Sequence, residues 1–288
     1  MTIGGKNMKI AVITDSGSNL NQAFVEKHPN LKVIPLMIVK DGVQFRDQID
    51  ITAEQIYKEI DEKNFSTSLP TMDSLEKAIE EVKKGGYTDV LVINISSGLS
   101  GTFNAFRLTL HDVKGINIHQ YDTKTLGAGE GYLVELALDL IEAGNKPEEI
   151  IQALDKCRFE DSLAIYTINT LKYLKKGGRI GKVEGTIGDL LRIKPVITVN
   201  NEGVYVTLSK AIGMQRSLLN MKELMVKKFG DSLVDLTVHY GEDLEKATQL
   251  GSMMSKTLNV RNLNISALTP VLGIHTGPQM FAFVARKI

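Results

Sequence analysis

Serine, threonine and glycine gather in one short stretch whose chemistry suits an anion. Residues 96–102 read Ser-Ser-Gly-Leu-Ser-Gly-Thr and directly follow the apolar run Asp89–Ile95. The hydroxyls can donate hydrogen bonds, and the two glycines let backbone N–H groups approach a ligand closely. A carboxylate or a phosphate would fit such a loop. The simpler alternative, that Ser96 or Ser97 only caps the following helix, stays open from the sequence.

A second hydroxyl-rich stretch, Ser66–Thr71, precedes another predicted helix. Thr67, Ser68 and Thr71 have donors that could face a ligand, although hydroxyls before a helix more often serve as turn and cap residues. The stretch is therefore a candidate for the same site only if the fold brings it close to residues 96–102.

His275 is the histidine with the best case for a function. It lies in the segment Gly273–Pro278, which reads as a glycine- and proline-bounded loop before the last strand. An imidazole in such a loop can face a ligand. The five histidines are scattered along the chain, so the sequence predicts no metal site.

Other motifs of nucleotide and ester chemistry are incomplete. The glycines of residues 127–131 follow a strand but have the spacing GxGxG rather than GxGxxG, so a dinucleotide site is not indicated. In residues 98–102 a threonine stands where a hydrolase nucleophile elbow needs its last glycine.

The composition is that of an ordinary globular protein. The 288 residues carry 34 Lys plus Arg and 34 Asp plus Glu, so no net charge draws the protein to nucleic acid. A single cysteine, Cys157, excludes an internal disulfide and predicts a reducing, cytoplasmic location. No apolar run reaches about eighteen residues, so no membrane-spanning helix is predicted.

The first half of the chain repeats the order strand, polar loop, helix three times. The strands are predicted at Lys9–Thr14, Asp89–Ile95 and Ile116–Tyr121. This order predicts an α/β domain over residues 8–160 with a parallel, doubly wound sheet, whose ligands bind at the carboxyl ends of the strands. Within this half, Leu31–Val39 and Val43–Arg46 predict two strands of a hairpin.

The second half, residues 161–288, predicts an α+β domain that is richer in hairpins. Pro195–Val199 and Val204–Leu208 flank the turn Asn200–Gly203. Residues 180–191 predict an irregular, glycine-punctuated segment. The first seven residues, polar and glycine-rich, predict an extension outside the fold.

Taken together, the polar loops resemble those of the DegV family. The matching motifs occur in order along almost the whole chain and are specific as a set: Ala11–Ser16, Thr67–Thr71, Ser97–Thr102, Asp122–Lys124 with the following glycines, Leu171–Ile180, Lys194–Ile197 and His275–Pro278.

The resemblance implies a two-domain protein that holds one long-chain fatty acid between its domains. It also implies that the protein presents this acid to a fatty acid kinase, which converts the carboxyl group to an acyl phosphate. The expected ligands of the carboxyl group are Thr67, Ser97 and His275, with Arg179 supporting them. The protein itself would be a carrier rather than an enzyme, without a cofactor or a nucleic-acid partner, and with room for transient membrane contact.

The sequence departs from the family pattern in one stretch. Where members commonly carry a basic Lys-x-Arg-x-Arg segment, this chain reads Lys210–Met214, Lys-Ala-Ile-Gly-Met, with Arg216 and Lys182 as the nearby basic residues. If that basic surface recruits the kinase, the departure bears on the kinase partnership and leaves the lipid site untouched.

Two alternatives remain on the same scaffold. A small-molecule phosphotransferase component would use His275, and a serine hydrolase would use Ser97 or Ser100. A third reading is an α/β protein without a ligand. Several loops that carry hydroxyl, histidine and arginine side chains are expected to meet in one place, which argues against that reading.

Overall fold

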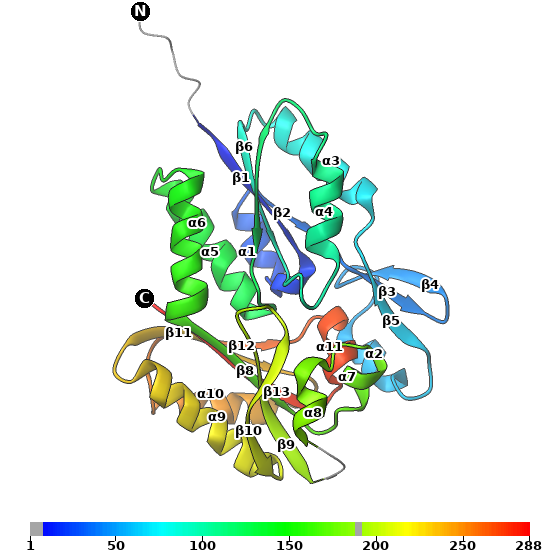
Figure 1. Cartoon of the computed structure of the whole chain (residues 1–288), viewed down its shortest axis with the longest axis vertical. Coiled ribbons are helices and arrows are strands. Elements are labelled where there is room, and N and C mark those ends of the chain that lie inside the picture. The colour runs from blue at the N-terminus through cyan, green and yellow to red at the C-terminus, as the bar shows by residue number, and fades with distance from the viewer. Residues whose placement is uncertain (1–7, 188–191) are drawn as a thin grey trace, which may run out of the picture.

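The computed structural model describes residues 8–187 and 192–288. The extension predicted over residues 1–7 and the last part of the segment 180–191 lie outside the described residues. The strands form three sheets, and the two larger sheets are built from different halves of the chain (Figure 1).

The first sheet is parallel and has helices on both faces, as the sequence predicts. Its strands lie in the order β2-β1-β6-β7, with β1 Ile10–Asp15, β2 Leu31–Ile34, β6 Asp89–Asn94 and β7 Asn117–Asp122. One face packs on α1 (Gln22–Lys27), α5 (Ala128–Glu142) and α6 (Pro147–Lys156). The other face packs on α3 (Met72–Lys84) and α4 (Thr102–Leu110). Apolar side chains alternate between the two faces because successive residues of a strand point in opposite directions.

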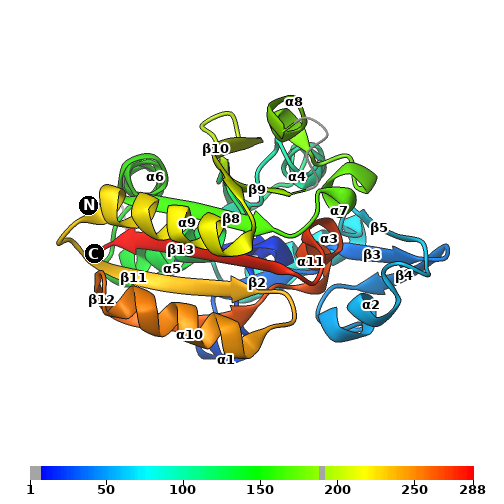
Figure 2. The same cartoon turned by 90° about the horizontal axis from the view of Figure 1, so that it is seen from below.

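The second sheet has six strands in the order β10-β9-β8-β13-β11-β12. They are β8 Ser162–Ile168, β9 Ile193–Val199, β10 Tyr205–Ile212, β11 Leu233–Tyr240, β12 Asn259–Ala267 and β13 Met280–Lys287. The predicted hairpin is present as the antiparallel pair β9 and β10. Helices α9 (Met214–Phe229) and α10 (Leu244–Ser255) lie across one face, in yellow and orange in Figure 2. The opposite face is turned toward the first half of the chain.

A small antiparallel sheet, β4-β3-β5, corrects two predictions. The run Leu31–Val39 is not one strand: it breaks at Pro35, and β3 (Met37–Lys40) leaves the parallel sheet to pair with β4 (Val43–Arg46). The stretch Ser66–Thr71 is not wholly a loop, because β5 (Phe65–Ser68) pairs with β3 and places Thr67 opposite Ile38. This pairing supplies the backbone hydrogen bonds, so a polar stretch becomes a strand.

The small sheet shares its core with the second half of the chain. Ile38 and Phe65, with residues of α2 (Ala53–Glu59), pack against Ile168 and against α7 (Lys172–Lys176) and α11 (Pro270–Thr276). Every strand of the first and the small sheet lies before residue 161, and every strand of the six-stranded sheet lies after it. The division into domains 8–160 and 161–288 itself stays a prediction, since this core crosses it.

Helix α11 corrects a third prediction, because the sequence predicts a loop over Gly273–Pro278. Residues 270–276 form a helix that begins with Thr269 at the N-cap position and Pro270 in the first turn. Proline favours this position, since its missing N–H would have no partner in the helix. The remaining short helices are η1 (Ser16–Ser18), η2 (Cys157–Asp161), η3 (Gly181–Val183) and α8 (Glu184–Ile187).

Candidate functional site

A cavity of about 320 Å³ lies between the two halves of the chain. That volume is at the lower end of the range of small-molecule sites. Its wall is mainly apolar and comes from both halves: Leu36, Leu69, Ile95, Leu99 and Leu126 from the first, and Ala164, Val199, Leu268, Val271, Leu272, Met280, Ala282 and Val284 from the second. An elongated aliphatic group is the kind of ligand that such a wall would remove from water.

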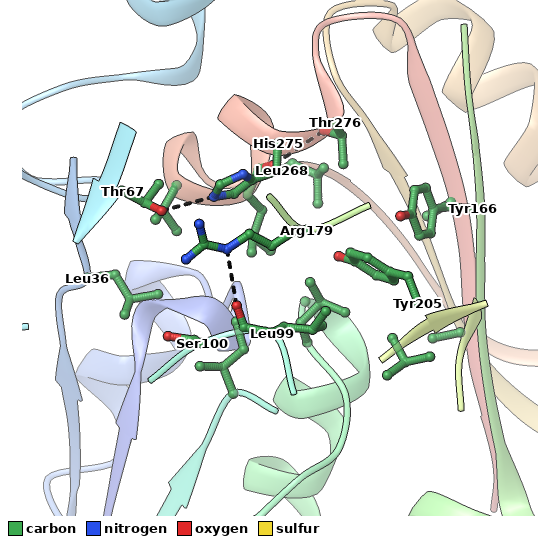
Figure 3. A pocket seen from close by; sticks show the side chains of 18 of the residues that line it. Leu36, Thr67, Leu99, Ser100, Tyr166, Arg179, Tyr205, Leu268, His275 and Thr276 are labelled. Carbon is green, nitrogen blue, oxygen red and sulfur yellow. Dashed lines mark hydrogen bonds between the residues drawn. The ribbon is translucent and has the colours of Figure 1, made fainter. Parts of the chain in front are cut away.

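Thr67 and His275 form the polar end of this cavity. The Thr67 hydroxyl and the His275 Nε2 atom are 2.9 Å apart, within hydrogen-bond distance (Figure 3). Thr67 stands on β5 and His275 on the last turn of α11, and these two elements pack together. The contact therefore depends on the shared core described above.

His275 is held as a neutral imidazole. Burial, and then the positive charge of Arg179, lower its pKa to about 4. Its Nδ1 atom is buried and has no hydrogen-bond partner among the described residues. A Cβ atom on Gly177 would lie 2.2 Å from Nδ1, so the imidazole fits only beside a glycine. A neutral ring with its single proton on Nε2 can donate that proton either to Thr67 or to a ligand.

Arg179 projects between the Thr67–His275 pair and the Leu99–Ser100 backbone (Figure 3). Its Nε donates to the Leu99 carbonyl over 3.3 Å, and its Nη1 donates to the Gly177 carbonyl over 2.5 Å. Gly178 has a φ of +70°, a conformation that glycine adopts easily, and it turns the chain back immediately after α7. This turn delivers a guanidinium cation to the polar end of the cavity.

The structure does not bring Ser97 to this group. The Ser97 hydroxyl accepts a hydrogen bond from Lys124 Nζ over 2.9 Å, and Lys124 is also paired with Asp122 over 2.7 Å. Ser97 is absent from the cavity wall, whereas Ser100 of the same loop is part of it. Ser100 Oγ lies 2.8 Å from the Thr102 hydroxyl.

The alternative that the loop hydroxyls only cap a helix is wrong for the 96–102 loop and correct for Thr71. Neither Ser96 nor Ser97 caps α4, whose N-cap residue is Gly101. Ser96 instead donates to the carbonyl of Gly203 over 2.7 Å and so ties the loop to the β9–β10 turn. Thr71 does serve as a cap, because its hydroxyl accepts from the backbone N–H of Ser74 at the start of α3.

Two tyrosines and a second histidine that sequence reasoning missed also line the cavity. Tyr166 stands on β8 and Tyr205 on β10, and both line the cavity. His239 on β11 accepts from the backbone N–H of Ala128 over 3.0 Å and has its Nδ1 3.0 Å from the Ser266 carbonyl. Burial lowers the pKa of His239 to about 4, so it joins β11 to α5 as a neutral ring. The only sequence signal for the tyrosines is their place in apolar strands, which core tyrosines share.

The hydrolase alternative finds little support in these contacts. A serine nucleophile needs an adjacent base. The amine beside Ser97 belongs to a lysine held by a carboxylate, and the group beside Ser100 is another hydroxyl.

Over residues 8–187 and 192–288, no cluster of three or more metal-ligating side chains is found. Across the same residues, no helix is both long and apolar enough to cross a membrane.

Known proteins are similar to this chain over almost its whole length. A model of the DegV family, described as uncharacterised proteins, matches residues 9–287. The chain belongs to the DegV family. A DegV domain-containing protein of Clostridium acetobutylicum is 36% identical over 279 residues, which cover 97% of this chain and 99% of the relative.

Solved structures with the same fold include proteins described as fatty-acid-binding. A fatty-acid-binding DegV family protein from Thermus thermophilus is 27% identical, with a TM-score of 0.90 over 98% of this chain and 100% of the other. A stearic acid-binding protein from Eubacterium ventriosum is 26% identical, with a TM-score of 0.85 over 96% of this chain and 98% of the other. The mixed α/β architecture with two larger sheets is thus that of the DegV family.

Proposed function

We propose that this protein binds one long-chain fatty acid in the cavity between its two halves. The observation that carries the proposal is the division of one cavity into an apolar length and a polar end that holds Thr67, His275 and Arg179. The fatty acids bound by the similar Thermus and Eubacterium proteins support it.

The aliphatic tail supplies the affinity. Each methylene moved from water into an apolar site contributes about 0.8 kcal/mol, so a chain of about sixteen carbons can bind tightly. A lone buried carboxylate would cancel much of this gain unless hydrogen bonds replace its water. Thr67 and His275 supply neutral donors, and Arg179 supplies a positive charge at the same end of the cavity. The head group is therefore oriented by a small set of fixed contacts.

We place Ser100, rather than Ser97, among the ligands of the carboxyl group. Ser100 lines the cavity close to Arg179, whereas Ser97 is engaged with Lys124. The role that the family resemblance gives to Ser97 stays a prediction, and a comparison of the two serine variants can test it.

The same polar residues also border a second, smaller cavity. This cavity, about 150 Å³ in volume, shares Thr67, Arg179 and His275 with the first and adds Ser66, Lys176 and Gly177. A carboxyl group held by the shared residues would lie where both cavities meet. This arrangement supports the further proposal that the protein is a carrier that offers the carboxyl group to a fatty acid kinase, which forms the acyl phosphate. The single cysteine supports a reducing cytoplasm as its location.

Two experiments test these proposals in order. Solvent extraction of purified protein followed by mass spectrometry should release about one fatty acid per chain, and delipidated protein should take up palmitate. Protein that is consistently free of lipid and cannot be loaded would refute the binding proposal. Loaded protein is then incubated with a fatty acid kinase and ATP, where formation of acyl phosphate is expected. A known carrier protein serves as the positive control. If it gives acyl phosphate and the loaded protein gives none, the carrier role is refuted and the binding proposal is not.

A further inference from the structure

Tyr166 places an unpaired hydroxyl in the wall of the acyl cavity. Tyr166 is 8% exposed, and its Oη atom has no hydrogen-bond partner among the described residues. The neighbouring inward-facing positions on the central strands, such as Ala164 and Ala282, are apolar. A buried hydroxyl without a partner costs free energy, which a ligand with an acceptor atom would recover.

Tyr205 lies beside Tyr166 and extends this polar spot. The two ring centroids are 5.3 Å apart in an edge-on arrangement. In Figure 3 both hydroxyl ends point toward the side of the cavity where Arg179 lies. Burial raises the pKa of both phenols above their usual value, so both keep their protons and can donate at neutral pH. The two hydroxyls are close enough to influence each other's pKa, although Tyr166 Oη has no hydrogen-bond partner among the described residues.

The position of the pair separates it from the carboxyl end. Thr67 lies on the far side of Arg179 from the tyrosines, and His275 lies next to Arg179 (Figure 3). The two groups also come from different elements, β5 and α11 for the first and β8 and β10 for the second. A fatty acid whose carboxylate is bound at Thr67 would pass the tyrosine hydroxyls with its aliphatic chain. A plain alkyl chain offers those hydroxyls no acceptor.

We propose that the cavity preferentially accepts fatty acids that carry an oxygen function, a hydroxyl or a keto group, part-way along the chain. The ligand oxygen accepts a hydrogen bond from Tyr166, and Tyr205 is close enough in the wall to take part. This inference rests on the proposed fatty-acid function and narrows its substrate class. The interaction is one of binding and requires no chemical step.

The test compares stearate with monohydroxystearates that carry the hydroxyl near the carboxyl group, at mid-chain or near the methyl end. Dissociation constants are measured by calorimetry on delipidated wild-type protein. One hydroxylated isomer should bind about fivefold more tightly than stearate, the ratio expected for one recovered neutral hydrogen bond. Equal or weaker binding of every hydroxylated isomer would overturn the inference. Failure of all the acids, stearate included, would instead refute the fatty-acid function.

Tyr166→Phe serves as the matched variant, because it removes the hydroxyl and keeps the ring. It should abolish the preference for the hydroxylated isomer while stearate binds at least as tightly as before. Weaker binding of all acids to the same degree would show that Tyr166 serves the carboxyl group, and would overturn the inference. Tyr205→Phe is measured in parallel and should reduce the preference less. The wild-type comparison decides the question even if a variant fails to fold.

Discussion

The Thr67 hydroxyl and the His275 imidazole are 208 positions apart in the chain and 2.9 Å apart in the structure. Each comes from a different half, and the pair closes the polar end of the cavity. The contact requires β5, α11 and the core they share to be in place. Binding of a head group at this pair is therefore coupled to the packing of the two halves.

Replacing Thr67 should weaken fatty-acid binding through the loss of one hydroxyl. Thr67→Val keeps the shape of the side chain and removes its donor, so the carboxylate loses a hydrogen bond worth about 1.5–3 kcal/mol, or about ten- to a hundredfold in Kd. Thr67→Ser is the control and should retain most of the affinity. Palmitate titrations of the three proteins decide the point. Equal affinity of the valine and serine variants would contradict the assigned role.

The two serines of the 96–102 loop should behave differently. Ser100→Ala should raise the Kd for palmitate about tenfold, since Ser100 lines the cavity beside Arg179. Ser97→Ala should leave the Kd unchanged, because Ser97 is not part of the cavity wall. Thermal unfolding of both variants controls for misfolding. The reverse order of effects would restore Ser97 as the ligand.

Arg179 should matter for charged head groups only. Arg179→Gln removes the cation near the carboxyl site, so palmitate should bind about tenfold or more weakly. The corresponding fatty alcohol has no charge to balance and should bind wild type and variant with similar affinity. A comparable loss for both ligands would mean that Arg179 shapes the cavity rather than neutralising the head group.

Asp47 should make the protein less stable as the pH rises. It is 1% exposed, its Oδ1 accepts from the Val271 N–H over 2.9 Å, and burial raises its pKa to about 7. The folded state holds this proton more tightly than the unfolded chain. The associated stability is therefore present below about pH 4 and is lost as the pH rises to about 7.

Asp47→Asn should remove this part of the pH dependence. Urea unfolding of wild type and variant at pH 5 and pH 8 should show a smaller loss of unfolding free energy in the variant, by a difference on the order of 2 kcal/mol. Asp15, whose pKa burial raises to about 6, is present in both proteins and leaves a residual slope. Identical slopes would mean that Asp47 is already ionised in the folded protein across this range.

The incorrect predictions share one cause. Local composition predicts a single strand over Leu31–Val39 and a loop over Gly273–Pro278. In the structure, β3 leaves the parallel sheet to pair with β5, and residues 270–276 form α11 against the core that β5 completes. Long-range packing selected conformations that the local residues only permit. Thr269 followed by Pro270 is typical of the start of a helix, with threonine at the N-cap and proline in the first turn.

The sequence by itself determined the parallel α/β first half, the β9–β10 hairpin and the family resemblance. These follow from periodicities and ordered motifs, which are properties of neighbouring residues. Only the tertiary structure decided which hydroxyls meet the cavity: Thr67 and Ser100 line its wall, and Ser97 turns to Lys124. It also decided that Tyr166 and Tyr205, which belong to the shared core, line the cavity as well. The direction of a side chain at such a site depends on the pairing and packing of distant segments, which no local pattern encodes.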